Sequence, residues 1–373
     1  MMPATDLFVI GAGIAGCCVA YFARQAGFRV TIVDAGVHRA SAVPTALINP
    51  VRGKQGYFVK GGDVAARATF ALIDALIAQG HAIVHGKGVW RPVPDAATYD
   101  KWCSTLPATY PHRWHLPAPA ELALQGDWHA ALYLPEAGWV DTASFLSALQ
   151  SASAAAMVHG EVASIDMPER WIDDAAINIS NMAANAANPS SKNQLVQIQL
   201  RDGRQLSAQQ LVWCGGAYGA HCLLQESAGK LAKAARFQPG QIIKLAQAIA
   251  PQPVSYGLFA APWLANGQVT PLGNSIGPST EYASDNFASA IASSSASTAL
   301  HKLRERVIDL FSHADAATLA ATSSWQGVRL AQVTLPVTLP NLTGLGSKGY
   351  LLAPMLAKAL VDQMVSHHAP SPA

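Results

Sequence analysis

Three glycines and one acidic residue near the N-terminus have the types and spacing that bind a dinucleotide. Gly11, Gly13 and Gly16 form a G-x-G-x-x-G turn, and Asp34 follows eighteen residues after the last of them. The first glycine permits a tight turn, the second lets the backbone approach a pyrophosphate, and the third lets a helix lie close to the preceding strand. Asp34 is placed to accept hydrogen bonds from a ribose. These residues predict a dinucleotide site.

The elements around this turn have the order that such a site needs. Leu7–Ile10 is an apolar run that predicts a buried parallel strand, and Ile14–Ala26 continues as an Ala-rich helix. After Gly27, the apolar residues of Arg29–Val33 predict a second strand that ends at Asp34. The helix N-terminus then offers free N–H groups and a positive dipole end to phosphates. The alternative is a strand–helix–strand unit whose turn binds nothing.

Length and composition favour a globular protein with a large core. The chain has 373 residues, of which 50% are hydrophobic and 13% charged, so we expect one large or two closely joined domains. A net charge of +2 indicates no strongly basic face for nucleic acid. The five cysteines are odd in number and lack paired spacing, so we expect neither a disulfide framework nor a metal site. The uncharged stretch Leu7–Ala23 is short and interrupted by glycines, so we expect a soluble, cytoplasmic protein with no membrane partner.

Further along the chain, strands and helices alternate in a pattern that predicts an α/β fold. Asp63–Gln79 has the apolar spacing of an amphipathic helix, and Asp141 is placed to cap a helix that follows it. Gln210–Cys214 predicts a buried strand that ends at two glycines, and Leu351–His367 predicts a last helix. Asn178–Asn193 is rich in Asn, Ala and Ser and predicts an exposed loop insertion.

In this order, the landmarks resemble the FAD-dependent D-amino-acid oxidase (DAO) superfamily, which includes glycine and sarcosine oxidases. The similarity extends over nearly the full length of the chain. Its segments are the glycine turn with Asp34, the loop with Ala40, Ser41, Ala42, Ala46, Asn49 and Pro50, Gly138–Asp141, Val212–Gly216, Pro239–Gln241, Trp325–Arg329 and Gly344–Pro354. The family more often has Glu where this chain has Asp34, and Arg where it has Pro239. The segment Leu335–Leu342 is shorter than the strand pair that the family usually has there.

The resemblance implies noncovalently bound FAD and a fold of the α/β class with an α+β second lobe. A Rossmann-like FAD-binding domain would comprise residues 1–80, 138–220 and 322–373. A discontinuous, mixed-sheet substrate domain would comprise residues 81–137 and 221–321. The residues implied to contact FAD are Gly11, Gly13, Ile14, Ala15, Gly16, Asp34, Ala35, Ser41, Ala42, Ala46, Val162, Gly215, Gly216, Gly346, Ser347, Lys348, Gly349 and Tyr350.

Two cationic residues are the candidates for catalytic roles. Arg329 follows a Trp-x-Gly strand start in an apolar segment, and a guanidinium orients an amino acid by two parallel hydrogen bonds to its carboxylate. Lys348 lies in the glycine loop before the last helix, where a cation and a helix N-terminus attract the negative charge that reaches a flavin. A surface ion pair for Arg329 and a solvent-facing Lys348 are the alternatives. Weaker candidates for the substrate pocket are Arg52, Lys54, Tyr256 and Tyr282.

The function that the resemblance implies is oxidation of the C–N bond of a small amine or amino acid to an imine. Hydride would pass to the flavin, water would hydrolyse the imine, and oxygen or another acceptor would reoxidise the flavin. The ending GLGSKGYLLAPMLAKAL is most similar to stand-alone DAO-like oxidoreductases and to the FAD module of the enzyme that modifies the tRNA wobble uridine. One alternative is therefore removal of a carboxymethyl group from tRNA, although the low net charge counts against it. The other is an FAD-binding protein without catalytic activity.

Overall fold

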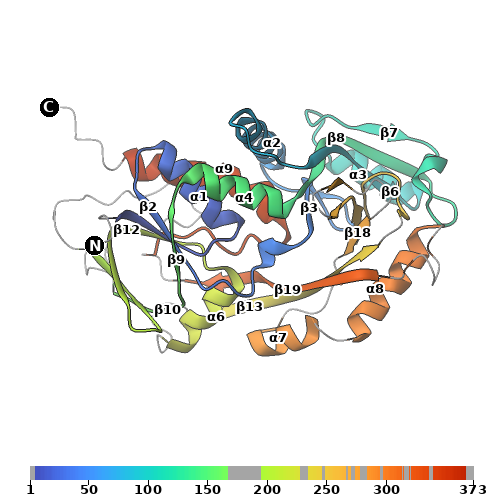
Figure 1. Cartoon of the computed structure of the whole chain (residues 1–373). Helices are drawn as coiled ribbons and strands as arrows, with labels where there is room; N and C mark the ends of the chain where they lie inside the picture. Colours follow the sequence, from blue (N-terminus) through green and yellow to red (C-terminus); the bar gives the residue numbers. More distant parts are fainter. Residues whose placement is uncertain are drawn as a thin grey trace.

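Two β-sheets organise the computed structural model, one in each lobe (Figure 1). The structure describes residues 5–366, apart from 167–194, 227–233, 246–247, 266–267, 270–273, 278–283, 295–296, 313, 315–318, 320 and 336–338. The insertion expected at Asn178–Asn193, Tyr282 and part of the short segment Leu335–Leu342 therefore lie outside the described residues. Helices and sheets alternate as the α/β assignment predicts.

The first sheet is built around β1 (Thr5–Ile10), whose residues from Leu7 onward are buried. The parallel strands β12 (Gln205–Trp213) and β2 (Val30–Asp34) flank it, and β9 (Ala156–His159) pairs with β2. Parallel strands are apolar throughout because both faces of such a sheet are covered. The edge beyond β12 is antiparallel and consists of β11 (Val196–Leu200) and β10 (Val162–Asp166).

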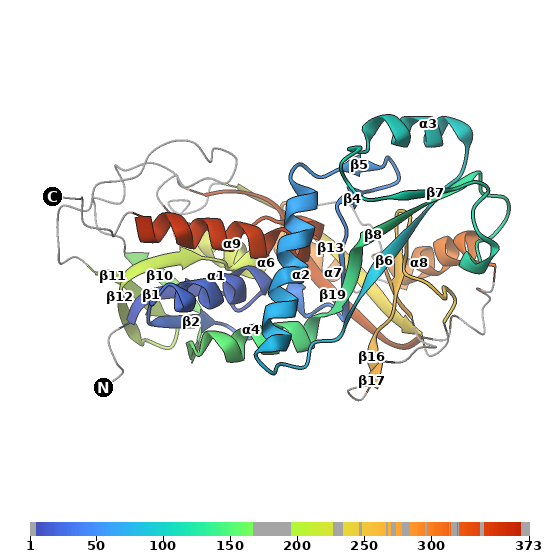
Figure 2. The ribbon, with the colours of Figure 1, turned by 90° about the horizontal axis from the view of Figure 1, so that it is seen from above.

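Helices α1 (Ile14–Gln25), α4 (Thr142–Ser153) and α9 (Gly349–Ser366) pack together over one face of this sheet, where α9 runs beside α1 (Figure 2). The helix α2 (Gly62–Ala78) crosses them and contacts α9. The predicted cap of α4 is confirmed, since the Asp141 carboxylate accepts a hydrogen bond from the Ser144 N–H at 2.8 Å. One continuous apolar cluster joins these helices to β1 and β2.

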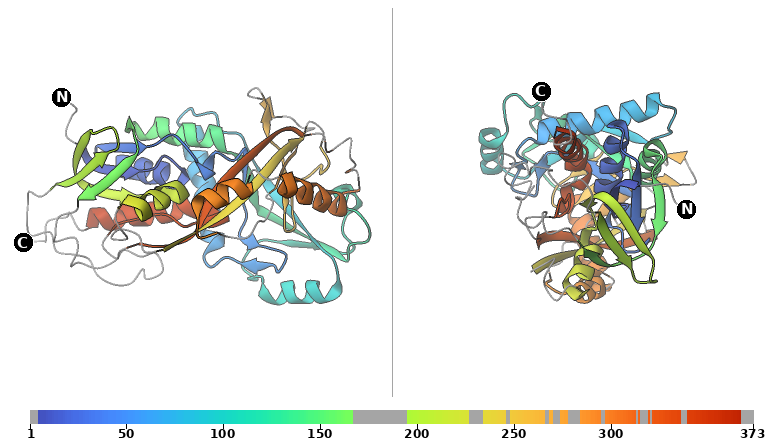
Figure 3. Two further views of the ribbon diagram at one scale, coloured as in Figure 1. Left: turned by 90° about the horizontal axis from the view of Figure 1, so that it is seen from below. Right: turned by 90° about the vertical axis from the view of Figure 1, so that its left-hand side faces the viewer.

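The second sheet is mostly antiparallel. Its longest pairing joins β13 (Ala234–Leu245) to β19 (Ala321–Thr334), and α7 (Phe287–Ser294) lies along both strands (Figure 3, left). The remaining strands of the sheet are β18 (Asn274–Gly277), β15 (Phe259–Ala261), β14 (Val254–Ser255), β6 (His85–Val93), β8 (Ala130–Asp141), β7 (Arg113–His115) and β3 (Thr45–Ile48).

Short elements complete the two lobes. The other strands form two hairpins, β4 (Val51–Arg52) with β5 (Tyr57–Phe58) and β16 (Leu264–Ala265) with β17 (Gln268–Val269). The other helices are α3 (Ala96–Thr105), α6 (Gly216–Glu226), α7 (Phe287–Ser294) and α8 (Ser297–Leu310), with short 3-10 turns η1 (Ala40–Ala42), η2 (Ala120–Leu122) and η4 (Gly346–Lys348).

The chain returns to the first sheet just before its last helix. The Trp213 N–H donates to the Pro340 carbonyl at 2.8 Å, and the Leu342 N–H donates to the Trp213 carbonyl at 2.9 Å. These bonds align residues 339–342 with the end of β12. They bring the C-terminal glycines to the carboxyl edge of the sheet, next to the turn after β1.

Helix α7 packs on the second sheet through Phe287, whose ring centroid lies 5.3 Å from that of Phe237 and 4.8 Å from that of His221. Strands β3 and β19 come from segments assigned to the cofactor domain but pair in the second sheet, so the domain boundaries stay a prediction. In the described ranges, every helix is too short or too polar to span a membrane.

Candidate functional site

The turn after β1 can be made only by glycines at two of its positions. A Cβ atom on Gly16 would lie 1.8 Å from the Gly11 carbonyl oxygen, and a Cβ on Gly11 would lie 2.5 Å from the Cys214 carbonyl oxygen. Gly11 also has a φ of +102°, a conformation that other residues rarely adopt. The backbone therefore leaves open a space at the N-terminus of α1. The Ile14 N–H donates to the Ser41 hydroxyl at 3.0 Å, and the other N–H groups of this first turn favour an anion.

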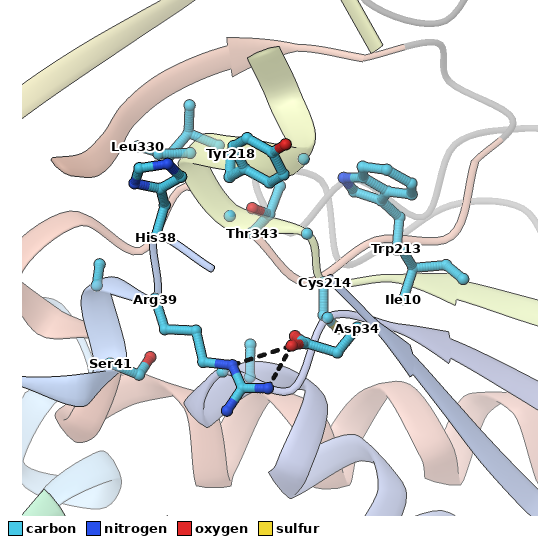
Figure 4. A pocket seen from close by; sticks show the side chains of 18 of the residues that line it. Ile10, Asp34, His38, Arg39, Ser41, Trp213, Cys214, Tyr218, Leu330 and Thr343 are labelled. Atoms are coloured by element: carbon cyan, nitrogen blue, oxygen red, sulfur yellow. Dashed lines mark hydrogen bonds and ion pairs between the residues drawn. The ribbon is translucent and has the colours of Figure 1, made fainter. Parts of the chain in front are cut away.

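Asp34 is held at the end of β2 by bonds to the same turn. Its Oδ2 accepts a hydrogen bond from the Ala12 N–H at 2.6 Å, and its Oδ1 accepts one from the Gly36 N–H at 2.7 Å. The Arg39 guanidinium also donates to Oδ1, with its Nε at 3.0 Å, and forms an ion pair with it (Figure 4). The carboxylate is only 8% exposed, so this ion pair is largely shielded from water.

These residues border a first cavity of about 160 Å³. It lies at the carboxyl edge of the first sheet, between the turn after β1, the end of β12 and residues 342–346. His38, Tyr218 and Leu330 gather on one side of it and Trp213 with Ile10 on another (Figure 4). Open α/β sheets bind their ligands at this edge of the strands.

A second cavity of about 670 Å³ adjoins the first and shares Ile14, Ser41, Arg329, Gly346 and Gly349 with it. This volume is in the range of small-molecule sites. One wall is the face of the second sheet formed by β19 and β13.

Strand alternation determines which side chains of that wall face the second cavity. Trp325, Gly327 and Arg329 alternate along β19, and their partners in register on β13 are Ile242, Gly240 and Gln238; all six line the cavity. A Cβ on Gly327 would lie 2.4 Å from the Trp325 ring, so the glycine leaves room for this ring over the strand. Arg329 follows on the same face.

Arg329 is half-buried at the border of the two cavities. Among the described residues, its guanidinium has neither a hydrogen bond nor an ion pair. Burial lowers its pKa, but an arginine stays charged at neutral pH. A cation in this position attracts an anionic group of a ligand.

Lys348 enters the second cavity from the turn before α9. Its Nζ donates to the Asn49 carbonyl at 2.7 Å, and Asn49 is itself buried. Burial and the positive charges of Arg91 and Arg52 lower the pKa of Lys348 to about 7. The α9 N-terminus follows at once, and a Cβ on Gly349 would lie 3.3 Å from Ile14, so the two glycine segments are neighbours.

The structure brings nearly all the predicted cofactor residues to these cavities. The first is lined by Gly11, Gly13, Ile14, Ala15, Asp34, Ala35, Ser41, Val162, Gly215, Gly216, Gly346 and Gly349. The second is lined by Ile14, Ser41, Ala46, Gly346, Ser347, Lys348, Gly349 and Tyr350. Two predicted residues line neither cavity: Gly16 is buried beneath the turn and Ala42 is exposed.

Two residues of the site were missed from the sequence. Arg39 lies only five residues after Asp34, and this acid-to-base spacing was a signal that could have been noticed. Arg91 had no local signal, because its guanidinium contacts the carbonyls of Val51 and Gly53, which are far from it in sequence. Of the weaker candidates, Arg52 lines the second cavity, whereas Lys54 lies over the Tyr256 ring at 5.0 Å.

Comparison with protein families identifies the family of the chain. The model of the family described as FAD dependent oxidoreductase (DAO) matches residues 6–363. This chain belongs to the DAO family of FAD-dependent oxidoreductases. The glycine turn, the α1 N-terminus and Asp34 fit FAD as a cofactor, because the turn leaves room for a pyrophosphate and the acid can accept ribose hydroxyls.

Individual relatives of this DAO-family oxidoreductase are distant. It is 24% identical, over 98% of its length, to the tRNA 5-methylaminomethyl-2-thiouridine biosynthesis bifunctional protein MnmC of Polaromonas sp. strain JS666, and it spans just over half (57%) of that protein. Similar solved structures include glycine oxidase from Geobacillus kaustophilus (18% identity, 99% of this chain and 96% of that one, TM-score 0.70). Iminodiacetate oxidase from Chelativorans sp. BNC1 is also similar (17% identity, covering 98% of this chain and 97% of that one, TM-score 0.72). Both structures share the fold of this chain.

Replacing Asp34 by Asn tests the role of this carboxylate in FAD binding. The amide keeps the shape but removes the charge that Arg39 faces, so we expect the free energy of unfolding to fall by about 2 kcal/mol. We also expect the FAD dissociation constant to rise roughly tenfold or more, since a charged acceptor makes the stronger hydrogen bond to ribose. Denaturant titration of the FAD-free protein and fluorescence titration with FAD measure the two effects.

Asp6→Asn is the matched control for Asp34→Asn. Asp6 forms a more exposed ion pair with Arg29 at the other end of β1. Surface pairs contribute about 0–1 kcal/mol, so this variant is expected to bind FAD as the parent does. Equal FAD affinity in Asp34→Asn and Asp6→Asn would remove Asp34 from the cofactor site.

Proposed function

We propose that this FAD-dependent oxidoreductase oxidises the C–N bond of a small amine or amino acid in the second cavity. The observation that carries the proposal is Arg329, a half-buried cation in the cavity wall whose guanidinium has no bonded partner in the described ranges. A cation held in this way is suited to orient a substrate carboxylate by two parallel hydrogen bonds. The fold shared with glycine oxidase and iminodiacetate oxidase supports an amino-acid substrate.

The other groups of the cavity have roles that follow from their charge. FAD supplies the acceptor for the hydride that leaves the carbon next to the amine nitrogen. Lys348 and the N-terminus of α9 together stabilise negative charge on that side of the cavity. The Asn49 carbonyl accepts a hydrogen bond from the Lys348 ammonium and holds it in position. We propose that the cofactor is noncovalent, and the exposed His38 in the turn before η1 takes no part in attaching it.

Anion binding in the second cavity should depend on pH through Lys348. The pKa of this ammonium is about 7, so the lysine is charged below that pH and becomes neutral above it. The dissociation constant of acetate from the FAD-loaded protein is therefore expected to be flat from about pH 5.5, where acetate is ionised, up to the Lys348 pKa. Above pH 7 it should rise and then level off, because the neutral lysine no longer adds its positive charge to the cavity while Arg329 stays charged. Perturbation of the flavin spectrum reports the binding.

The variant Lys348→Met removes the titrating group and serves as the comparison. Its acetate affinity should be weaker at low pH and nearly independent of pH across the same range. If the dissociation constant of acetate from the parent protein did not change between pH 7 and 9, the pKa of Lys348 would lie outside this range.

An anaerobic titration with paired donors tests the reaction type. Glycine and N-methylglycine carry the amine, and glycolate has a hydroxyl in place of the glycine nitrogen. The proposal predicts that an amine donor bleaches the visible flavin band, whereas glycolate binds without bleaching. Bleaching by glycolate alone would indicate C–O oxidation, and a flavin that no amine reduces would favour an FAD-binding protein without catalytic activity.

A second candidate is oxidation of a carboxymethylaminomethyl group on tRNA. The similarity to the MnmC protein over nearly the whole chain favours it, and the bond broken would be that of an N-substituted glycine. Neutralisation of several phosphates makes tRNA affinity fall steeply with salt. A tRNA affinity in the micromolar range with such a salt dependence, together with bleaching by tRNA and not by free N-alkyl glycines, would select this candidate.

A further inference from the structure

The second cavity has positive charge that no acidic residue in its walls offsets. Arg52, Arg329 and Lys348 are its only charged lining residues, and Asp and Glu are absent from the lining within the described ranges. Arg91 lies behind this wall, 1% exposed, and its bonds go to the carbonyls of Val51 and Gly53 and to a serine hydroxyl. Four cations therefore lie in or next to one cavity.

Several other arginines of this chain are paired with acids. Arg29 pairs with Asp6, Arg39 with Asp34, and Arg201 with Glu161. Grouping cations without counterions costs free energy, and a buried charge is ordinarily paired. The absence of acidic residues from the described lining of the second cavity indicates that ligands supply the missing negative charge.

The positive charge of this cavity is divided between two positions. Arg329 lies on β19, at the border with the first cavity. Arg52 lies on the β4–β5 hairpin, and Lys348 lies in the turn before α9, where its Nζ donates to the carbonyl of Asn49, just before that hairpin. The cavity thus offers one cation at the sheet and a second group of cations at the hairpin.

Arg91 fixes the hairpin group in place. Its guanidinium donates to the carbonyls of Val51 and Gly53, the residues on either side of Arg52, and stacks at 4.9 Å on the Trp102 ring. Both neighbours of Arg52 are therefore attached to a buried side chain of the second sheet. Arg52 itself is exposed at the cavity edge, where it can reach a ligand without a cost of burial.

We infer that the substrate carries two acidic groups, one bound at Arg329 and the other at Arg52 and Lys348. This inference rests on the proposed function and narrows its substrate class to an amine or amino acid with a second carboxylate. A substrate with one carboxylate would leave one of the two positive positions unmatched. A dicarboxylate matches both, and its second carboxylate adds affinity without changing the bond that is oxidised.

Unreactive ligands test the inference independently of the chemistry. Glutarate has two carboxylates on a three-carbon chain, and glutaramate has the same shape with one carboxylate replaced by an amide. Both are titrated into the FAD-loaded protein, with perturbation of the flavin spectrum as the readout. We expect glutarate to bind at least tenfold more tightly than glutaramate. An amine panel that fails to bleach the flavin would refute the proposed function while leaving this comparison intact.

Two variants of the hairpin complete the experiment. Arg52→Gln is expected to raise the dissociation constant of glutarate at least fivefold. The dissociation constant of glutaramate should stay within twofold of the value for the parent protein. Lys54→Gln removes a neighbouring cation that is absent from the described cavity lining and should change neither affinity. The inference would be overturned if the parent protein bound glutarate and glutaramate with equal affinity, or if it bound neither ligand. It would also be overturned if Arg52→Gln weakened the binding of both ligands equally.

Discussion

Replacing Gly16 by Ala is expected to yield a protein that no longer retains FAD. The new methyl group would lie 1.8 Å from the Gly11 carbonyl oxygen, so either the turn or helix α1 must move. Overpacking of this kind costs typically 1–3 kcal/mol and sometimes more, and about 3 kcal/mol corresponds to a roughly 100-fold weaker FAD affinity. The ratio of flavin absorbance to protein absorbance after purification, followed by FAD titration, measures the loss.

Gly27→Ala separates this effect from the general cost of losing a glycine. Gly27 has a φ of +92° just after α1, and a Cβ there meets no atom within 4 Å. Its substitution should lower the free energy of unfolding by about 1 kcal/mol and leave FAD binding near the parent value. A Gly16→Ala protein that retains a full equivalent of FAD would contradict the assignment of this turn to the cofactor.

Arg329→Gln is expected to reduce kcat/KM for a carboxylate-bearing amine by roughly 100- to 20,000-fold, because two charge-assisted hydrogen bonds of about 1.5–3 kcal/mol each are lost. For an amine without a carboxylate the loss should be under about threefold, since neither bond is made to that substrate. Anaerobic rates of flavin reduction, measured against concentration for N-methylglycine and for a simple alkylamine, give the comparison.

Arg236→Gln is the matched control on the paired strand. Arg236 is exposed on β13 and pairs with the exposed Asp285 at 3.5 Å. An exposed pair contributes about 0–1 kcal/mol to stability, so this variant should keep the kinetics of the parent. An equal loss for both kinds of amine in Arg329→Gln would remove Arg329 from the carboxylate role.

Sequence patterns predicted the first lobe well because the contacts there are local. The G-x-G-x-x-G turn, the apolar strand before it and Asp34 lie within thirty residues of one another, and the backbone contacts of Gly11 and Gly16 explain the glycine spacing. The α/β class, FAD as cofactor and the DAO family are confirmed. The roles of Arg329 and Lys348 stay predictions, although the structure places both in the wall of the same cavity.

The main feature that sequence patterns missed depends on residues that are distant along the chain. Arg91 looks like an ordinary strand residue, and only the fold brings the hairpin around Arg52 onto its guanidinium. Helix α7 is short, and its apolar residues Phe287, Ala290 and Ile291 have helical spacing that went unnoticed in an Ala/Ser-rich stretch. The Arg91 contacts, in contrast, produce no pattern in the local sequence.

Counting the products of a single turnover tests most directly the claim that this chain oxidises a C–N bond. The FAD-loaded protein is mixed without oxygen with the amine donor that bleaches it most readily, and the mixture is quenched once the flavin band has disappeared. The account predicts one equivalent of carbonyl compound and one of released amine per FAD reduced. Reduction of the flavin without these products, or no reduction by any amine donor, would contradict it.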